Sequence, residues 1–344
     1  MKVSRYNFFY PYAEATKAYV AYNSFKNSLA LLEEEYYFEF KKFEKDNTYK
    51  LDDNIVQELK KGGFLIDDQV DEITLLRHRI ISGRYSESTL GLTIAPTSDC
   101  NFRCLYCFEK ENRHDQTMNG EVQDNIIKFV ENCVPHISNL CVTWYGGEPL
   151  LALDIIEKIS KRLIELTRFN NIAYTASIVT NGYLLTCQNA KRLIGCNINN
   201  CQITIDGNAE THNVQRPHVS GKNTYETIME NLLSVSDLLS NIALRVNLNK
   251  ENKNSVYDLY NALKRLDIKN ISVYPAPIQN TNNCYNCDLC FANKDFLKFE
   301  YEYIKATYGD SFIKKKFPVL RGNVCCADRV NAYVIDADGE MYKC

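Results

Sequence analysis

Several features that would assign a chain to a class at once are missing from this sequence. No stretch approaches about 18 consecutive apolar residues, the length that a membrane-spanning helix needs. Lys and Arg number 40 against 43 Asp and Glu, and the net charge of −3 leaves no basic field for a nucleic acid. The start, MKVSRYN, lacks the apolar run and cleavage site of a signal peptide. We therefore expect a cytoplasmic protein without nucleic-acid or membrane partners.

Cysteine is the residue that is present in excess, with 14 copies in 344 residues. Apolar residues make up 45% and charged residues 24%, as in an ordinary globular protein. The length exceeds that of one typical domain. In a reducing compartment, cysteines are more often metal ligands or catalytic groups than disulfide partners. The cysteines are therefore the first candidates for a site.

The first 88 residues differ in pattern from the rest. Residues 17–22 and 28–32 predict two short strands joined by a turn. The helices expected in this part are 33–44, 54–61, for which Asp53 is the expected N-cap, and about 71–81. Two strands followed by short helices indicate a small α+β module of winged-helix type.

From Thr89 onward, strands and helices alternate in six βα units. The expected strands are 90–95, 140–145, 173–179, 201–205, 243–248 and 270–274. The expected helices are 119–132, 153–168, 186–194, 224–240, 255–266 and 295–308. Such a series predicts a parallel sheet with right-handed crossovers, open or rolled into a partial barrel. Chemistry is then expected at the carboxyl ends of the strands.

A cluster of three cysteines directly follows the first strand of this series. Cys100, Cys104 and Cys107 form a C-x3-C-x2-C motif. A structural zinc site would need four protein ligands. Three thiolates suit a 4Fe–4S cluster that keeps one iron open for substrate. The alternative is a zinc or structural site completed by a distant cysteine.

This motif, on the first of six βα loops, resembles that of the radical S-adenosylmethionine (radical SAM) superfamily. Gly146-Gly147-Glu148-Pro149, at the end of the second strand, resembles the family's GGEP motif, whose backbone holds the amino group of the cofactor. The resemblance implies that the three cysteines hold the cluster and that S-adenosylmethionine chelates its open iron. A 5′-deoxyadenosyl radical would then abstract hydrogen from an unactivated carbon. The alternative reading of Gly146-Gly147 is a simple strand-to-helix turn.

The later motifs resemble the branch of this superfamily that modifies proteins and peptides. That branch includes anaerobic sulfatase-maturating enzymes and maturases of ribosomal peptides. The resemblance adds Tyr106, near the adenine, and Thr180, Asn181 and Arg245 to the cofactor-binding residues. Arg245 could equally pair with a core carboxylate. Three further residues would lie near cofactor or substrate without an assigned role, namely Asp206, His212 and Arg216.

The C-terminal cysteines resemble the opening half of the SPASM domain, which binds auxiliary iron–sulfur clusters in this family. Cys326 and Cys344 form a C-x12-G-x4-C pattern, and residues 334–342 predict a β-hairpin that would bring the two together. The further cysteines of the family pattern do not follow, so we expect truncation within this domain. A second triple, Cys284, Cys287 and Cys290, could ligate another cluster, join an auxiliary site, bind zinc or be incidental.

The expected fold is thus α/β, a partial (βα)6 TIM-like barrel over residues 89–310. Residues 1–88 would precede it as a peptide-docking winged helix or a decorative extension, and 311–344 would begin the SPASM domain. The resemblance implies an enzyme that modifies a ribosomally made peptide, for example by a thioether or other crosslink, with a flavodoxin or ferredoxin as electron donor. The alternatives are an anaerobic sulfatase-maturating enzyme that forms formylglycine, and a non-catalytic cluster-containing peptide-binding protein. The sequence identifies no general base.

Overall fold

The structure is a computed structural model that describes residues 1–13, 16–112, 116–266, 268, 270–279, 285–312, 317–320 and 325–344. The chain forms two compact units. The first comprises residues 1–85 and 313–328, and the second comprises residues 86–312 and 329–344. Within the described residues, no helix combines the length and the apolar character that a membrane crossing requires.

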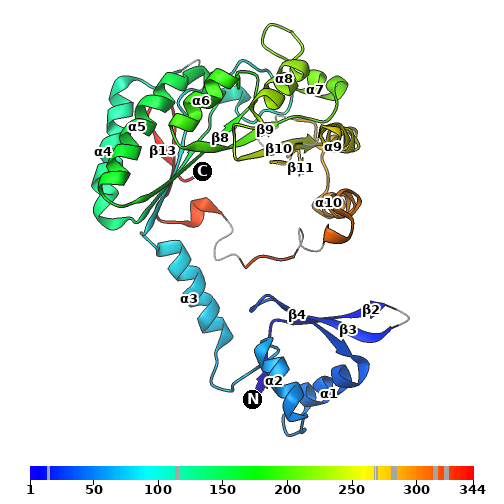
Figure 1. The fold of residues 1–344 in the computed structure, drawn as a ribbon. Helices are drawn as coiled ribbons and strands as arrows, with labels where there is room; N and C mark the ends of the chain where they lie inside the picture. The colour runs from blue at the N-terminus through cyan, green and yellow to red at the C-terminus, as the bar shows by residue number, and fades with distance from the viewer. Residues whose placement is uncertain are drawn as a thin grey trace. The chain divides into compact units, whose positions relative to one another are not determined.

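The first unit packs a small antiparallel sheet against short helices (Figure 1). Its strands, in sheet order, are β2 (Asn7–Ala13), β3 (Thr16–Asn23) and β4 (Ser28–Glu33). A separate pair is formed by β1 (Lys2–Val3) and β5 (Leu65–Ile66). The helices are α1 (Glu34–Lys45), α2 (Asp53–Lys61) and α3 (Glu72–Tyr85). One face of the sheet, α1 and α2 bury an apolar core that includes Ala21, Phe40, Phe43, Leu59 and Phe64.

Two sequence predictions for this unit are wrong in detail. The sheet has a third strand, β2, in front of the expected hairpin, and it pairs with β3 along most of its length. The N-cap of α2 is Asp52 instead of Asp53, because the Asp52 carboxylate accepts hydrogen bonds from the backbone amides of Asn54 and Ile55.

The second unit is built on an eight-stranded sheet with the order β11-β10-β9-β8-β7-β6-β12-β13. Strands β6 to β11 are parallel and adjacent in chain order, which confirms the predicted α/β fold with a partial TIM-like core. Their bounds are β6 (Thr89–Ile94), β7 (Asn139–Trp144), β8 (Ala173–Thr180), β9 (Ile198–Thr204), β10 (Asn241–Leu248) and β11 (Ile271–Pro277).

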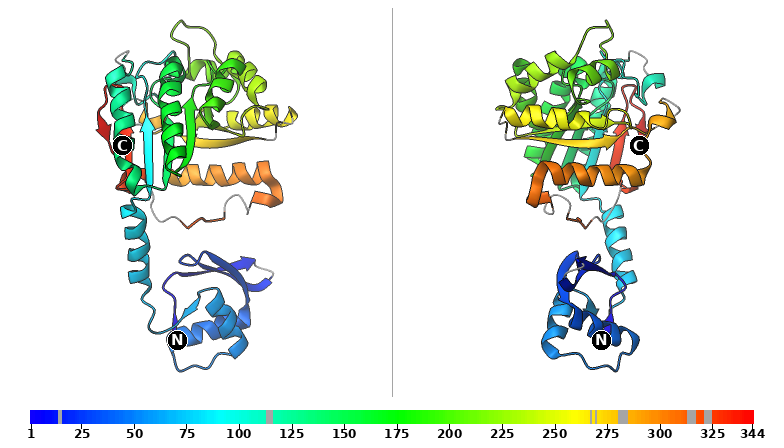
Figure 2. Two further views of the ribbon diagram at one scale, coloured as in Figure 1. Left: turned by 60° about the vertical axis from the view of Figure 1, so that its left-hand side comes forward. Right: turned by 90° about the vertical axis from the view of Figure 1, so that its right-hand side faces the viewer.

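Helices follow the strands and lie against one face of the sheet (Figures 1 and 2). They are α4 (Gly120–Cys133), α5 (Leu153–Phe169), α6 (Cys187–Gly195), α7 (Ala209–Gln215), α8 (Tyr225–Val235), α9 (Ser255–Arg265) and α10 (Asn293–Tyr308). Short 3-10 helices are η1 (Lys110–Asn112), η2 (Val134–His136), η3 (Pro149–Ala152), η4 (Cys287–Leu289), η5 (Gly309–Ser311) and η6 (Cys326–Asp328).

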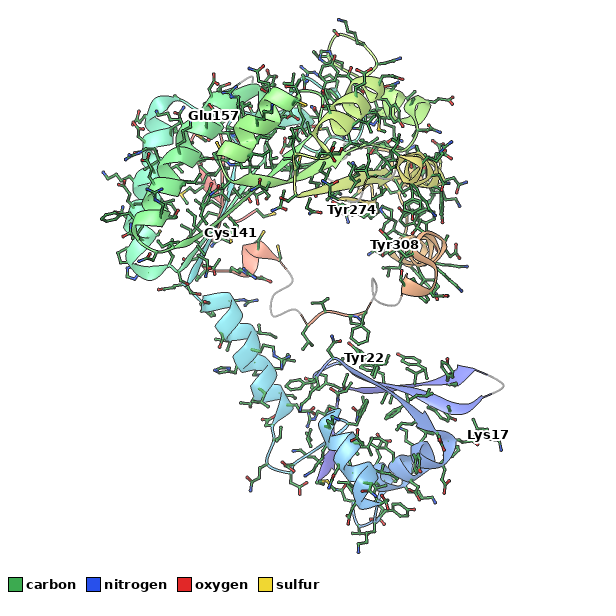
Figure 3. All side chains as sticks on the ribbon, in the orientation of Figure 1. Lys17, Tyr22, Cys141, Glu157, Tyr274 and Tyr308 are labelled. Carbon is green, nitrogen blue, oxygen red and sulfur yellow. The ribbon has the colours of Figure 1, made fainter. Side chains whose placement is uncertain are left out.

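The two faces of this sheet differ in polarity because side chains alternate along each strand. On β7, Leu140, Val142 and Trp144 are buried in the main core, whereas Cys141 is exposed on the opposite face. Figure 3 labels Cys141 and Tyr274, which extend from this second face. The second face is therefore available to line a cavity.

The C-terminal hairpin extends the parallel sheet, which the sequence analysis does not anticipate. Strand β12 (Ala332–Ile335) pairs in parallel with β6, and β13 (Met341–Tyr342) folds back antiparallel to β12. The pairing of β12 brings the C-terminal segment to the flank of the strand that leads into the cysteine motif.

Candidate active site

The segment before Cys100 is fastened to the glycine turn that ends β7. The backbone amide of Gly147 donates to the carbonyl of Thr97 at 3.1 Å, and that of Glu148 donates to Asp99 at 2.8 Å. A Cβ atom added to Gly147 would lie 2.1 Å from the Asp99 carbonyl oxygen. The turn therefore needs glycine here because two backbones meet directly.

A second backbone contact holds the other side of the cysteine loop. Residues 215–219 begin at the last residue of α7 and run along the loop. The carbonyls of Gln215 and Pro217 accept hydrogen bonds from the amides of Leu105 and Arg103, at 3.0 and 2.8 Å. The loop is thus clamped between two segments that come from distant parts of the chain.

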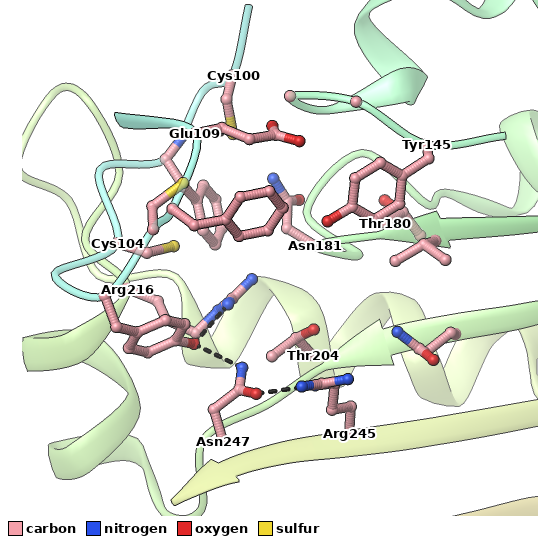
Figure 4. A pocket seen from close by; sticks show the side chains of 18 of the residues that line it. Cys100, Cys104, Glu109, Tyr145, Thr180, Asn181, Thr204, Arg216, Arg245 and Asn247 are labelled. Carbon is pink, nitrogen blue, oxygen red and sulfur yellow. Dashed lines mark hydrogen bonds between the residues drawn. The ribbon is translucent and has the colours of Figure 1, made fainter. Parts of the chain in front are cut away.

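The three cysteines line one cavity of about 710 Å³ at the carboxyl ends of the strands (Figure 4). This volume falls within the range of small-molecule sites. The cavity also contains most of the other residues that the sequence analysis selects. These are Tyr106, Gly146, Gly147, Thr180, Asn181, Arg245 and Cys344.

Glu148 and Pro149 lie outside this lining, and Glu148 is fully buried. The Glu148 carboxylate accepts hydrogen bonds from the Thr180 hydroxyl at 2.6 Å and from the Asn181 amide at 2.7 Å. Burial raises the pKa of Glu148, although these donors act in the opposite direction. Asn181 in turn donates to the side chain of Asn101 at 2.8 Å. Glu148 therefore links the ends of β7 and β8, and through them the cysteine loop.

The hydroxyl group of Tyr106 is the centre of a buried polar network. It accepts hydrogen bonds from Arg216 at 2.7 Å and from the Asn247 side chain at 2.9 Å, and it donates to Asp206. Asn247 also accepts from Nε of Arg245 at 2.8 Å, as Figure 4 shows. The network ties the cysteine loop to the ends of β9 and β10.

Burial controls the ionisation of the groups around this network. It raises the pKa of the Tyr106 hydroxyl well above its usual value and also raises that of Asp206. It lowers the pKa of His212, whose Nδ1 accepts from the Asp206 amide at 3.0 Å. His212 is therefore neutral, and its ring holds the backbone of Asp206 in place through this hydrogen bond.

The remaining cysteine predictions receive different placements. Cys344, which belongs to the second unit, lines the cavity. Cys326 lies in η6, which belongs to the first unit. A shared auxiliary cluster of these two stays a prediction. Cys284 lies outside the described residues, and the side chain of Cys287 is likewise not described. Cys290 is partly buried, in a segment fixed by a hydrogen bond from the amide of Lys250 to the carbonyl of Leu289.

The sequence analysis does not select several residues that line the cavity. Gln202 and Thr204 precede the Asp206 motif on β9, and Asn247 stands two positions after Arg245 on β10. Alternation along a strand puts residues i and i+2 on one face, so this spacing is the signal that could have found them. The Tyr274 hydroxyl donates a hydrogen bond to the side-chain amide oxygen Oε1 of Gln202 at 2.8 Å and so fixes the orientation of that side chain.

The donor set fits an iron–sulfur cluster better than a single metal ion. Among the described residues, no three His, Cys, Asp or Glu side chains converge as ligands of one ion, which a zinc site would require. The three cysteines instead surround a common cavity, and in a cluster each thiolate binds a different iron. The buried Nε of Arg216 and the side chains of Thr180 and Asn181 in the lining provide polar partners for a charged cofactor beside it.

The fold and this cavity define a partial-barrel protein with a cysteine-lined site at the carboxyl ends of its strands. Residues 94–263 match the model of the Radical SAM superfamily. The chain therefore carries a radical SAM domain, whose cofactors are a 4Fe–4S cluster and S-adenosylmethionine.

Known proteins similar to this chain extend the comparison. A cysteine-type anaerobic sulfatase-maturating enzyme of Clostridium novyi is 25% identical over 288 residues, which cover 74% of this chain and 73% of the relative. The solved structure of native anSMEcpe with bound AdoMet and Cp18Cys peptide has a TM-score of 0.60, 23% identity and 74% coverage of both chains. Streptococcus suis SuiB bound to precursor peptide SuiA has a TM-score of 0.56 and 12% identity, and covers 100% of this chain and 83% of SuiB.

Replacing Gly147 with Ala should impair cluster assembly, since the new Cβ would push the Asp99 backbone and displace Cys100. We expect a destabilisation of about 1–3 kcal/mol and a clear loss of iron after anaerobic reconstitution. Gly195→Ala is the matched control, because an added Cβ there meets no atom within 4 Å. Equal iron content in the two variants would contradict the proposed clamp.

The thiol of Cys100 should react slowly with iodoacetamide in the metal-free protein. Burial raises its pKa from 9.0 to about 12, so the thiol stays protonated where exposed thiols ionise. At pH 8.5, peptide mapping should show alkylation about tenfold or more slower than at exposed Cys141. The stability that the protonated thiol contributes is present below pH 9 and is lost as pH rises towards 12. Equal rates at the two cysteines would refute this assignment.

Proposed function

We propose that this chain is a radical SAM enzyme that modifies a ribosomally made peptide, forming a thioether or another crosslink. The observation that carries the proposal is an apolar groove along the open edge of β4 in the first unit. It provides a docking place for a peptide in a protein that also carries a radical SAM site.

The groove has a volume of about 610 Å³ and lies between β4 and α2. Among the described residues, no strand pairs with the outer edge of β4. Leu29 and Leu31 on this strand are 53% and 59% exposed, which is unusual for large apolar side chains on an edge strand. Ile55 and Leu59 of α2 form the opposite wall, and Lys61 lies at the groove.

The occupant that fits this groove is the leader segment of a precursor peptide, added to β4 as a further strand. An added strand pairs with the backbone groups of the edge and places every second side chain in the groove. The leader should thus carry apolar residues at alternate positions. The fold similarity to SuiB, whose solved structure holds its precursor peptide SuiA, covers all of this chain and supports a peptide as the substrate.

The residues of the second unit divide the work of holding the cofactors. The thiolates of Cys100, Cys104 and Cys107 would hold the cluster. The backbone at Gly146 and Gly147, together with Thr180, Asn181 and Arg245, would hold S-adenosylmethionine. When bound, these cofactors supply one-electron cleavage of the sulfonium and hydrogen abstraction from the substrate. A flavodoxin or ferredoxin would supply the electron in the cytoplasm, and Cys326 and Cys344 would contribute to an auxiliary cluster.

A second candidate function is the maturation of an anaerobic sulfatase by oxidation of its active-site Cys or Ser to formylglycine. The similarity to the Clostridium novyi enzyme supports it, because the matched region covers about three quarters of both chains. The two candidates differ in substrate and not in cofactor chemistry.

The reconstituted full chain should convert S-adenosylmethionine to 5′-deoxyadenosine under reducing conditions. Mass spectrometry should also show a two-hydrogen loss in a small cysteine-rich peptide encoded beside the gene. The triple variant Cys100→Ala, Cys104→Ala, Cys107→Ala should lose about four irons and both activities. Conversion of a sulfatase peptide alone would favour the second candidate. A cluster without any cleavage would leave a non-catalytic binding protein.

The substitution Leu31→Asp should weaken binding of the same peptide's leader by about tenfold or more, roughly 1.4 kcal/mol, because it places a charge in an apolar groove. Fluorescence anisotropy with a labelled leader measures this change. Leu297→Asp is the matched control, since Leu297 is 62% exposed on α10 of the second unit. Equal affinities of both variants would exclude β4 as the docking edge.

A further inference from the structure

The positively charged side chain of Arg216 packs against the cysteine loop. Its side chain is only 7% exposed. One terminal nitrogen donates to the Tyr106 hydroxyl at 2.7 Å, and the guanidinium carbon lies 5.7 Å from the ring centroid of Phe102. Both partners belong to the loop between Cys100 and Cys107. The loop and the arginine are therefore built as one structure.

The charge of Arg216 has no direct counterion among the described residues. No carboxylate lies within 4.0 Å of its nitrogens in that part of the chain, and its buried Nε donates no hydrogen bond there. Asp206 is the nearby acid, but it bonds to the Tyr106 hydroxyl and to the Asn247 amide. A buried cation is costly unless an opposite charge accompanies it, so the arrangement calls for an anion in the cavity.

The cysteine thiols are the groups on which this charge acts. Arg216 lines the cavity together with Cys100 and Cys104, and Figure 4 shows the guanidinium on the same side as the Cys104 thiol. A cluster held by these thiolates would therefore lie in the same cavity as the buried positive charge.

We propose that Arg216 stabilises the reduced form of the cluster and so raises its midpoint potential. A cluster held by three thiolates gains one more negative charge when it accepts an electron. A nearby buried cation stabilises the more negative state more strongly, because the local dielectric is low. Tyr106 acts as the positioning residue, since its hydroxyl holds the guanidinium in place.

The test is a redox titration of the full, anaerobically reconstituted chain, with dithionite as electron donor and no S-adenosylmethionine or peptide present. Electron paramagnetic resonance reports the reduced cluster per four irons. Arg216→Gln keeps amide donors but removes the charge. We expect at least about a tenfold lower ratio of reduced to oxidised cluster at the wild-type midpoint, a shift of about 59 mV to lower potential. Arg216→Lys keeps the charge and should remain within about threefold of wild type.

The control is Arg192→Gln, which removes an arginine that pairs with Asp154 and Glu157 and does not line the cavity. It should leave the potential unchanged. An unchanged potential in Arg216→Gln, or an equal shift in Arg192→Gln, would overturn the proposal. If Arg216→Gln holds no cluster, the potential of Arg216→Lys decides: a ratio within about threefold of wild type supports the charge effect, and a tenfold or larger change overturns it. Because no peptide is needed, the result is independent of the proposed function.

Discussion

The cysteine loop has little regular structure of its own, so its shape depends on backbone hydrogen bonds from two sides. The glycine turn after β7 holds the residues before Cys100, and residues 215–219 hold the residues around Cys104. Backbone contacts of this kind tolerate no side chain between them, which is why the turn carries glycine. The position of the three cysteines in the cavity follows from the placement of this loop.

Polar groups inside the second unit serve this placement as much as they serve binding. Glu148 is a buried acid whose hydrogen bonds join two strand ends, and Tyr106 joins the loop to two others. A buried network of this type specifies one arrangement, since each unmade hydrogen bond is costly in a low dielectric. The glutamate of the GGEP motif thus has a structural task that its motif does not reveal.

The alternating pattern of strand and helix was sufficient to predict the parallel sheet, because buried parallel strands have strong apolar signals. Strand β2 was missed because its aromatic run does not alternate with polar residues and contains Pro11, which normally argues against a strand. The three cysteines and the glycine turn could be found from spacing alone. The contacts of Asp206 and Asn247 could not, because they depend on which strand ends become neighbours. The pairing of β12 with β6 depends on a register that no local pattern encodes.

That pairing has a consequence for how the protein is made. Ile94 of β6 and Ile335 of β12 are partners in register but lie about 240 residues apart in the chain. Contacts of such high sequence separation form slowly, because a long loop must close before they are gained. During synthesis, the strand that leads into the cysteine loop therefore keeps one unpaired edge until residues 332–335 have left the ribosome. An unpaired strand edge is prone to association with other chains, so cofactor insertion and protection from aggregation should both depend on how quickly β12 arrives.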